Sequence, residues 1–195
     1  MKKTIAVTGG IGSGKSVVIE ELGKMGYAVF SADEIYKEKL NDEKFVRAIY
    51  NALGIEIPDG KRLVFDKKIV AAAVFGDKAL LKKLNAVTHP TIMDEIMKRA
   101  DAVKADAVFC EVPLLFECGY VNMFDYTIVV RRNIEARIKS VETRDGLSEK
   151  EILIRIKNQF DYANLSEKGN ILILNNDGSR DSLILGINEI IKKIL

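Results

Sequence analysis

Short apolar runs alternate along this chain with longer segments whose apolar residues recur at helical spacing. Such runs are typical of buried strands, and the longer segments are typical of amphipathic helices. The alternation predicts an α/β fold in which helices cover both faces of a mainly parallel, five-stranded sheet. We expect strands at Thr4–Val7, Ala28–Phe30, Ala107–Cys110, Tyr126–Val130 and Ile171–Leu174, and helices at Ser16–Met25, Asp33–Leu53, Lys78–Ala100, Ile134–Arg144, Glu149–Tyr162 and Ser179–Leu195.

The sequence GGIGSGKS occupies positions 9–16, directly between the first expected strand and the first expected helix. In this context it predicts a P-loop, whose backbone N–H groups surround a phosphate at the positive end of a helix. Lys15 is placed to reach the β- and γ-phosphates of ATP, and Ser16 to bind Mg²⁺. A glycine-rich turn with Lys15 in solvent is the less favoured alternative. The expected phosphate-binding residues are Gly10, Ile11, Gly12, Ser13, Gly14, Lys15, Ser16 and Val17, and Ser16 is the expected metal ligand.

Two stretches of the chain do not fit the simple alternation. Residues 31–106 are rich in helical pattern and are longer than a simple βαβ connection requires. Residues 133–168 read as two helices joined by a turn. A small-molecule kinase needs one insertion to hold the acceptor and another to close over the phosphates and exclude water. We therefore expect a single P-loop kinase domain over residues 1–195, with a core at 1–32, 101–132 and 169–195, a helical acceptor-binding region at about 33–100 and a helical lid at about 133–168.

Composition limits the classes of partner. The net charge of +2 argues against a strongly electrostatic partner such as duplex DNA, so no nucleic-acid partner is expected. No apolar stretch approaches the ~20 residues that span a bilayer, so no membrane partner is expected either. Cys110 and Cys118 lack the C-x-x-C spacing of a zinc or redox site. We expect two buried thiols in a cytoplasmic protein that is a monomer or a weak homo-oligomer.

Two carboxylates follow expected strands, where ligands of open α/β sheets bind. Asp33 follows the second strand and is suited to accept or orient the proton of an acceptor hydroxyl. An equally weighted alternative is that Ser31 or Asp33 only caps the next helix. Glu111 directly follows the third strand, where P-loop proteins often keep an acidic group near the metal.

Cations of the second insertion are candidates to stabilise charge on the transferring phosphate. For Arg137, Arg144 and Arg155 a solvated helix face is the alternative reading, and Arg144, at the expected turn, is the strongest candidate. The single histidine, His89, precedes Pro90. Pro90 is suited to begin a helix, and a structural role for His89 is favoured on position alone.

Several of these segments occur in the order found in the dephospho-CoA kinase family, which the chain resembles nearly from end to end. The family's P-loop resembles residues 8–16, and its Asp-Ala-Asp motif is similar to residues 31–33. The matching segments that follow are His89-Pro90, Pro113-Leu114-Leu115-Phe116-Glu117, Arg144-Asp145-Gly146-Leu147-Ser148, Arg155-Ile156 with Gln159, and Asn176 with Gly178.

The resemblance implies transfer of the γ-phosphate of ATP to the ribose 3′-hydroxyl of dephospho-CoA, giving CoA and ADP in the last step of CoA synthesis. It implies that Asp33 is the general base or the group that orients the acceptor hydroxyl. With Lys15 and Arg144, expected from their charge, Asp33 completes the predicted catalytic residues. It raises the functional reading of His89 to about even with the structural one. Implied substrate-binding residues are Thr8, Asp33, His89, Pro113, Leu114, Leu115, Phe116 and Glu117; implied adenine-side residues are Asn176 and Gly178; implied lid residues are Arg137, Arg144, Arg155 and Gln159.

Three residues depart from the family pattern: Ser31 replaces an aspartate, Lys67 an arginine, and Ser140 an arginine that many members carry. Loss of such charged contacts predicts a slower or weaker-binding enzyme. Ser31 also leaves open a second hypothesis, a P-loop kinase of a nucleoside or nucleotide. A third, a switch protein that hydrolyses a nucleotide, is disfavoured because the chain lacks the N-K-x-D and D-x-x-G segments of such GTPases.

Overall fold

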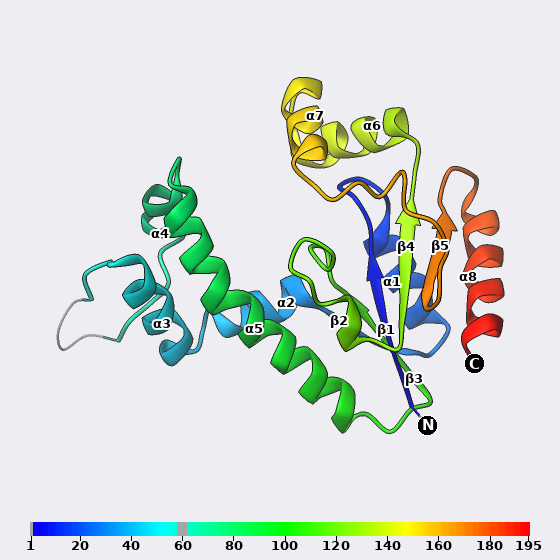
Figure 1. Cartoon of the computed structure of the whole chain (residues 1–195), viewed down its shortest axis with the longest axis horizontal. Helices are drawn as coiled ribbons and strands as arrows, with labels where there is room; N and C mark the ends of the chain where they lie inside the picture. The colour runs from blue at the N-terminus through cyan, green and yellow to red at the C-terminus, as the bar shows by residue number, and fades with distance from the viewer. Residues whose placement is uncertain (1, 58–61) are drawn as a thin grey trace. The chain divides into compact units, whose positions relative to one another are not determined.

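The computed structural model describes residues 2–57 and 62–195 (Figure 1). The chain forms two compact units. The first, which we call the sheet unit, contains residues up to 30 and residues 102–195. The second, the helical unit, contains residues 31–101. Within the described residues, no helix combines the length and apolar character needed to cross a membrane.

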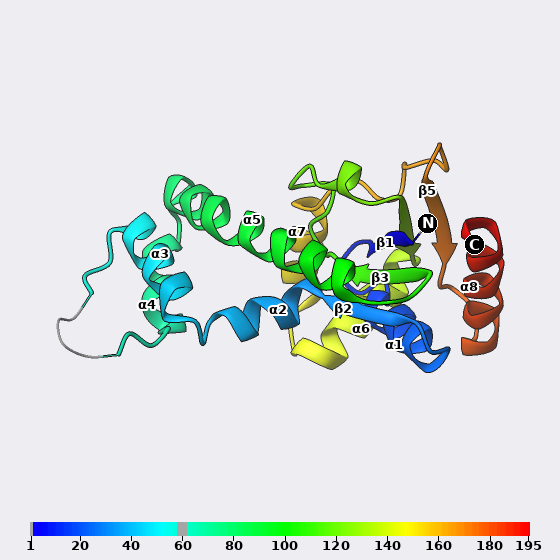
Figure 2. The same cartoon turned by 90° about the horizontal axis from the view of Figure 1, so that it is seen from below.

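The sheet contains the five strands expected from the sequence, in the order β2-β3-β1-β4-β5 (Figures 1 and 2). Strand β1 pairs in parallel with β3 and β4, and β4 pairs in parallel with β5. The chain after β1 therefore emerges at the point where the strand order reverses, which is where α/β sheets bind ligands. The strands are β1 (Lys3–Thr8), β2 (Ala28–Ser31), β3 (Ala107–Glu111), β4 (Tyr126–Arg131) and β5 (Ile171–Asn175).

Both faces of the sheet are buried, as the continuous apolar runs indicate. On one face, Ile5, Val7 and Phe109 pack with residues of α1 (Lys15–Lys24) and α8 (Arg180–Ile194). Side chains that alternate with them, such as Ala6 and Val108, are also fully buried. This burial fixes the strand ends, and therefore the position of the loop that follows β1.

The expected lid region forms two helices, α6 (Ile134–Asp145) and α7 (Glu149–Lys157). Gly146, at φ 67°, ends α6, and Ser148 caps α7 by accepting a hydrogen bond from the backbone of Glu151. The expectation that the second helix continues to Tyr162 is wrong: residues after Lys157 leave the helix because they bond to distant parts of the sheet unit. A single 3₁₀ turn, η1 (Val121–Met123), precedes β4.

The helical unit contains α2 (Ala32–Lys39), α3 (Glu43–Leu53), α4 (Lys67–Val74) and α5 (Lys78–Ala102). The single helix expected over 33–53 is wrong, because the Asp42 side chain accepts from Lys44 N and starts a new helix. Sequence reasoning missed α4, which Asp66 caps in the same way through Lys68 N and Ile69 N.

Pro90 lies inside α5 rather than at the start of a helix. Thr88 and Thr91 donate hydrogen bonds to the carbonyls of Leu84 and Val87, so polar contacts continue along this part of the helix. Burial of Ile92, Met93 and Ile96 holds the following turns in place. We attribute the intact helix to this packing, which outweighs the roughly 3 kcal/mol cost of an internal proline.

Candidate active site

The loop between β1 and α1 has the backbone conformation that its glycines permit. Gly12 has φ 74° and Gly14 has φ 95°, values that L side chains rarely adopt. A Cβ at Gly14 would overlap Asn176 Nδ2, and a Cβ at Gly12 would overlap the backbone of Arg137. These two glycines are therefore needed both for the turn and for close approach of α6 and of the chain after β5.

Lys15 is the first residue of α1, and its ammonium group folds back over the loop. Lys15 Nζ donates to Gly9 O at 2.9 Å and to Gly10 O at 3.2 Å. The lysine is half-buried. The loop carbonyls thus hold the positive charge beside the backbone that is expected to surround the phosphates.

Ser16 contacts a buried carboxylate at the end of β3. Its hydroxyl donates to Glu111 Oε1 at 2.9 Å. Glu111 is only 9% exposed and lies opposite Val7 in the parallel register of β1 and β3. A hydroxyl and a carboxylate at this spacing supply the oxygen ligands that Mg²⁺ prefers.

The helices after β4 and the segment that follows them contribute two side chains to the loop. Arg137 Nε donates to Ile11 O at 2.9 Å, and Ile11 N donates to Gln159 Oε1 at 2.8 Å. Burial lowers the pKa of the Arg137 guanidinium, which nevertheless remains charged at neutral pH. The structure thus brings two of the four predicted lid residues to the backbone of one P-loop residue.

The other two predicted lid residues are exposed. Arg144 forms a bidentate ion pair with its neighbour Asp145, with both N···O distances at 2.8 Å. This pairing raises the pKa of Arg144 and lowers that of Asp145. Arg155 lies on the exposed face of α7 and contributes to the lowered pKa of Asp145. The catalytic role of Arg144 stays a prediction.

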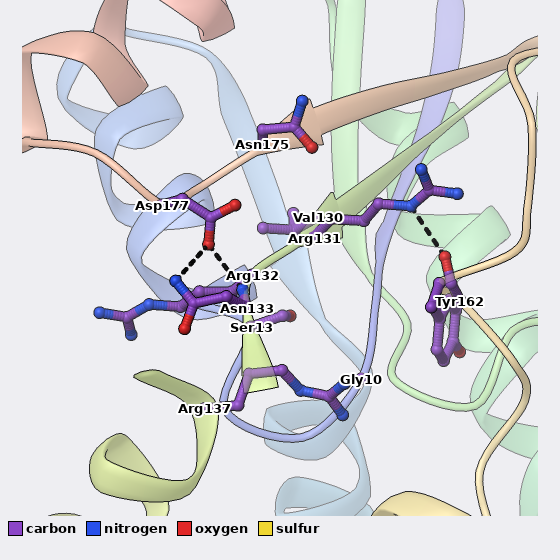
Figure 3. A pocket seen from close by; sticks show the side chains of 11 residues that line it. Gly10, Ser13, Val130, Arg131, Arg132, Asn133, Arg137, Tyr162, Asn175 and Asp177 are labelled. Atoms are coloured by element: carbon purple, nitrogen blue, oxygen red, sulfur yellow. Dashed lines mark hydrogen bonds between the residues drawn. The ribbon is translucent and has the colours of Figure 1, made fainter. Parts of the chain in front are cut away.

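A cavity of about 220 Å³ lies beside the loop (Figure 3). The loop residues Gly10 and Ser13 line one side, and Arg131, Arg132, Asn175 and Asp177 line the strand ends. Asp177 Oδ1 accepts hydrogen bonds from both the backbone and the side chain of Asn133. Among the described residues, Ser13 Oγ, Arg131 Nη2 and Arg132 Nε are buried atoms without a hydrogen-bond partner, and all three belong to residues that line the cavity.

The two predicted adenine-side residues, Asn176 and Gly178, are the sequence neighbours of Asp177, which lines this cavity. Asn176 Nδ2 donates to Ser13 O at 2.9 Å, so its side chain braces the P-loop. Gly178 begins the turn before α8, where Ser179 accepts from Ser182 N. Asp177, between them, lines the cavity and was not identified from the sequence.

The segment Pro113–Glu117 contains one buried and several accessible residues. Leu115 is fully buried, whereas Leu114 is 42% exposed. Glu117 Oε1 accepts from Phe160 N at 3.0 Å, and Tyr162 Oη donates to Glu117 Oε2 at 3.1 Å. Thr8 Oγ1 lies 3.4 Å from the same hydroxyl, and burial raises the pKa of Tyr162.

Sequence reasoning did not identify Tyr162 as a site residue. Its ring also packs edge-on against Phe116 and Phe160, whose own rings stack with centroids 4.5 Å apart. The only sequence signal was the aromatic pair around Asp161, which the helical pattern concealed.

Two further predicted residues lie in the helical unit. Asp33 is exposed in the first turn of α2, and Ser31 occupies the N-cap position without forming a side-chain capping bond. His89 is half-buried in α5, and burial lowers the pKa of its imidazole. The roles of Asp33 and His89 toward an acceptor stay predictions.

The sequence profile of the dephospho-CoA kinase family matches residues 3–181. The chain belongs to the dephospho-CoA kinase family. A dephospho-CoA kinase of Thermus thermophilus is 32% identical over 191 residues, covering 97% of this chain and 91% of the relative. Another, from Chlorobaculum tepidum, is 33% identical over 199 residues, covering 98% of this chain and 94% of the relative. This chain is therefore a kinase of that family.

Solved structures agree with this assignment. The crystal structure of TT1252 from Thermus thermophilus is 30% identical, with a TM-score of 0.80 over 100% of this chain and 98% of that chain. The dephospho-CoA kinase from Campylobacter jejuni has a TM-score of 0.69 at 27% identity, with the same coverage. A shikimate kinase from Bacteroides thetaiotaomicron, 12% identical with a TM-score of 0.53 over 98% of each chain, shares the fold alone.

Proposed function

We propose that the chain transfers the γ-phosphate of ATP to the ribose 3′-hydroxyl of dephospho-CoA, giving CoA and ADP. Membership of the dephospho-CoA kinase family supports dephospho-CoA as the acceptor. The observation that carries the donor side is the arrangement of Lys15 and Ser16 in a P-loop closed over by Arg137 and Gln159. Phosphoryl transfer needs positioning and fixed positive charge above all, and this arrangement supplies both.

Lys15 acts on the β- and γ-phosphates of ATP in this proposal. It exchanges its bonds to the Gly9 and Gly10 carbonyls for phosphate oxygens, which bind a cation more strongly than neutral carbonyls do. The loop N–H groups and the N-terminus of α1 add to the positive field at the same place.

Ser16 and Glu111 fit the Mg²⁺ that the family implies. The Ser16 hydroxyl would be a ligand of the ion, and buried Glu111, which accepts from that hydroxyl, would orient it and add negative charge beside it. Mg²⁺ normally binds through few protein oxygens together with phosphate oxygens and water. When bound, it neutralises charge on the β- and γ-phosphates.

The cavity beside the loop suits the adenine side of ATP. Arg131 and Arg132, which line it, carry guanidinium N–H donors, and such donors match the ring-nitrogen acceptors of a purine. Asn176 joins this region to the phosphate site through Ser13 O. Base and triphosphate would thereby occupy continuous parts of the sheet unit.

Asp33 orients or deprotonates the acceptor hydroxyl in this proposal, and His89 lies on the acceptor side. An exposed carboxylate is available for such a contact. Arg144 stabilises charge on the transferring phosphate after its guanidinium releases Asp145. A cytoplasmic location, with the protein a monomer or a weak homo-oligomer, completes the proposal.

The decisive experiment measures Mg²⁺-dependent ADP release from ATP by purified protein, with dephospho-CoA, adenosine, nucleoside monophosphates or no acceptor. We expect stimulation by dephospho-CoA alone, with CoA as the product. Stimulation by a nucleoside or nucleotide would instead support a changed acceptor site, for which Ser31 is the observed departure. Release without any acceptor would contradict a kinase function.

A further inference from the structure

The backbone of Ile11 is held from both sides by the chain that follows β4. Its N–H donates to Gln159 Oε1 at 2.8 Å, and its carbonyl accepts from Arg137 Nε at 2.9 Å. These bonds come from residues more than a hundred positions away along the chain. One P-loop residue therefore has both of its backbone polar groups fixed by side chains from outside the loop.

The peptide group between Gly10 and Ile11 links Gln159 to Lys15. Its N–H bonds to Gln159, and its carbonyl, that of Gly10, accepts from Lys15 Nζ at 3.2 Å and from Ser13 N at 3.2 Å. Hydrogen bonds at the two ends of one peptide group polarise each other. The orientation that Gln159 imposes on this peptide is thus the orientation in which Gly10 O faces Lys15.

Gln159 lies in the non-helical segment after α7, residues 158–162, and hydrogen bonds of its neighbours attach this segment to the rest of the sheet unit. Phe160 N donates to Glu117 Oε1, and Arg131 Nε donates to Tyr162 O at 2.8 Å. The aromatic stack of Phe116 on Phe160 adds apolar contact at the same point. In Figure 1 this segment passes the carboxyl ends of the strands on its way from α7 to β5. The attachment of this segment holds Gln159 Oε1 where it can accept the hydrogen bond from Ile11 N.

We propose that Gln159 is a positioning residue of the phosphate site: its side-chain oxygen fixes the Gly10–Ile11 peptide and so keeps the P-loop in its phosphate-binding shape. The proposal rests on the proposed use of ATP as the donor. Gln159 acts through the loop and does not touch the phosphates. A preorganised loop avoids the cost of ordering backbone groups when the anion binds.

The first test is hydrogen exchange of the Ile11 amide, followed by NMR in the nucleotide-free protein. Gln159→Met keeps the length of the side chain and removes its carbonyl acceptor. Gln159→Glu keeps an acceptor oxygen. Asn158→Met is the matched control, because Asn158 is the exposed neighbour of Gln159. We expect exchange about fivefold faster in Gln159→Met and within about twofold of wild type in the other two variants.

The second test is the affinity for a non-hydrolysable ATP analogue with Mg²⁺. We expect Gln159→Met to weaken binding about three- to tenfold, the range of one neutral hydrogen bond, and Asn158→Met to leave it unchanged. Gln159→Glu is measured only in the exchange experiment, because the negative charge of the new glutamate would repel the triphosphate and change the affinity by itself.

Three results would overturn the proposal. Unchanged Ile11 exchange in Gln159→Met would show that the bond does not hold the loop. Equally fast exchange in Gln159→Glu would show that the acceptor oxygen is not the feature that matters. Faster exchange without weaker analogue binding would reduce Gln159 to a local structural contact. None of these results depends on the acceptor substrate, so failure of dephospho-CoA to react would be distinguished from failure of this inference.

Discussion

The P-loop of the sheet unit and the predicted acceptor residues of the helical unit differ in how firmly they are held. Lys15 bonds to the loop backbone, Ser16 bonds to Glu111 at the end of β3, and Ile11 bonds to Gln159 in the chain after β4. Asp33 instead projects from the first turn of a short helix and is exposed. The predicted phosphate site is thus held by the protein's own hydrogen bonds, whereas the carboxylate predicted to contact the acceptor is exposed.

The two units are also stabilised in different ways. The sheet unit buries strands on both faces, with Ile5, Val7 and Val108 fully buried. The helical unit consists of helices. Hydrogen bonds hold the chain between α3 and α4, where Tyr50 Oη accepts from Asp66 N. A change at the P-loop should act on ATP, and one in the helical unit on the acceptor or on local stability.

The largest expected effect is that of Lys15→Ala. Removing the ammonium group deletes a fixed charge from the transferring phosphate, so we expect kcat to fall at least about 100- to 1,000-fold. Steady-state ADP release is the measurement, and Lys150→Ala, at an exposed position of α7, is the control. A kcat within threefold of wild type would contradict the role of Lys15.

Asp33→Asn tests the helical unit in the same assay. If Asp33 acts as base or orienting group, kcat should fall about 10²-fold, the lower end of the contribution of a general base, while analogue affinity is unchanged. Glu34→Gln is the matched control, because Glu34 is also exposed in the first turn of α2. An equal loss of ATP affinity would show that the two regions are not separable, and an unchanged kcat would remove Asp33 from the chemistry.

The sequence predicted the parts of the sheet unit that depend on local patterns, and it did not predict the parts that depend on contacts between distant residues. The strands and the loop at 9–16 are local patterns: apolar runs, and glycines whose backbone angles are needed at Gly12 and Gly14. The departure of residues 158–162 from the helix could not be predicted, because Glu117 and Arg131, distant in sequence, bind that segment. Tertiary contacts of this kind override helical propensity.

The same reasoning applies to the helical unit. Asp42 and Asp66 are ordinary capping residues, and each is a local signal for a helix start, at α3 and at α4, that apolar spacing alone does not contain. Pro90 is the opposite case, since its local signal for a helix start is overridden by burial of Ile92 and Ile96. The contacts of Gln159 and Asn176 with the P-loop required the structure, because nothing in their spacing indicates the loop atoms that they bind.

Tyr50→Phe should produce a smaller effect, confined to stability. The Tyr50 hydroxyl accepts from Asp66 N at 2.9 Å and donates to Val64 O at 3.3 Å; Tyr50 is 3% exposed, whereas Val64 is 70% exposed. Because Asp66 is exposed, its N–H bonds to water once the hydroxyl is removed, so we expect the free energy of unfolding to fall by only about 0.5–1.5 kcal/mol in urea denaturation. Tyr27→Phe is the control, because the Tyr27 hydroxyl forms no hydrogen bond with other described residues. Weaker analogue binding in Tyr50→Phe would contradict the separation of the two regions.

Ser31→Asp should have the smallest effect and tests the point where the sheet ends and the helical unit begins. Ser31 occupies the N-cap of α2, is 9% exposed and forms no capping bond, so its hydroxyl contributes little to the helix. An aspartate there restores the carboxylate of the family motif and favours the helix N-terminus electrostatically. We expect kcat with dephospho-CoA to stay equal or to rise, by about threefold at most for a contact of this strength. Ser31→Asn, which adds similar volume without charge, separates the effect of the carboxylate from that of size. A loss of activity greater than about tenfold in Ser31→Asp alone would mean that the acceptor side has been rebuilt around an uncharged residue, and the acceptor comparison would then need to be repeated with nucleosides.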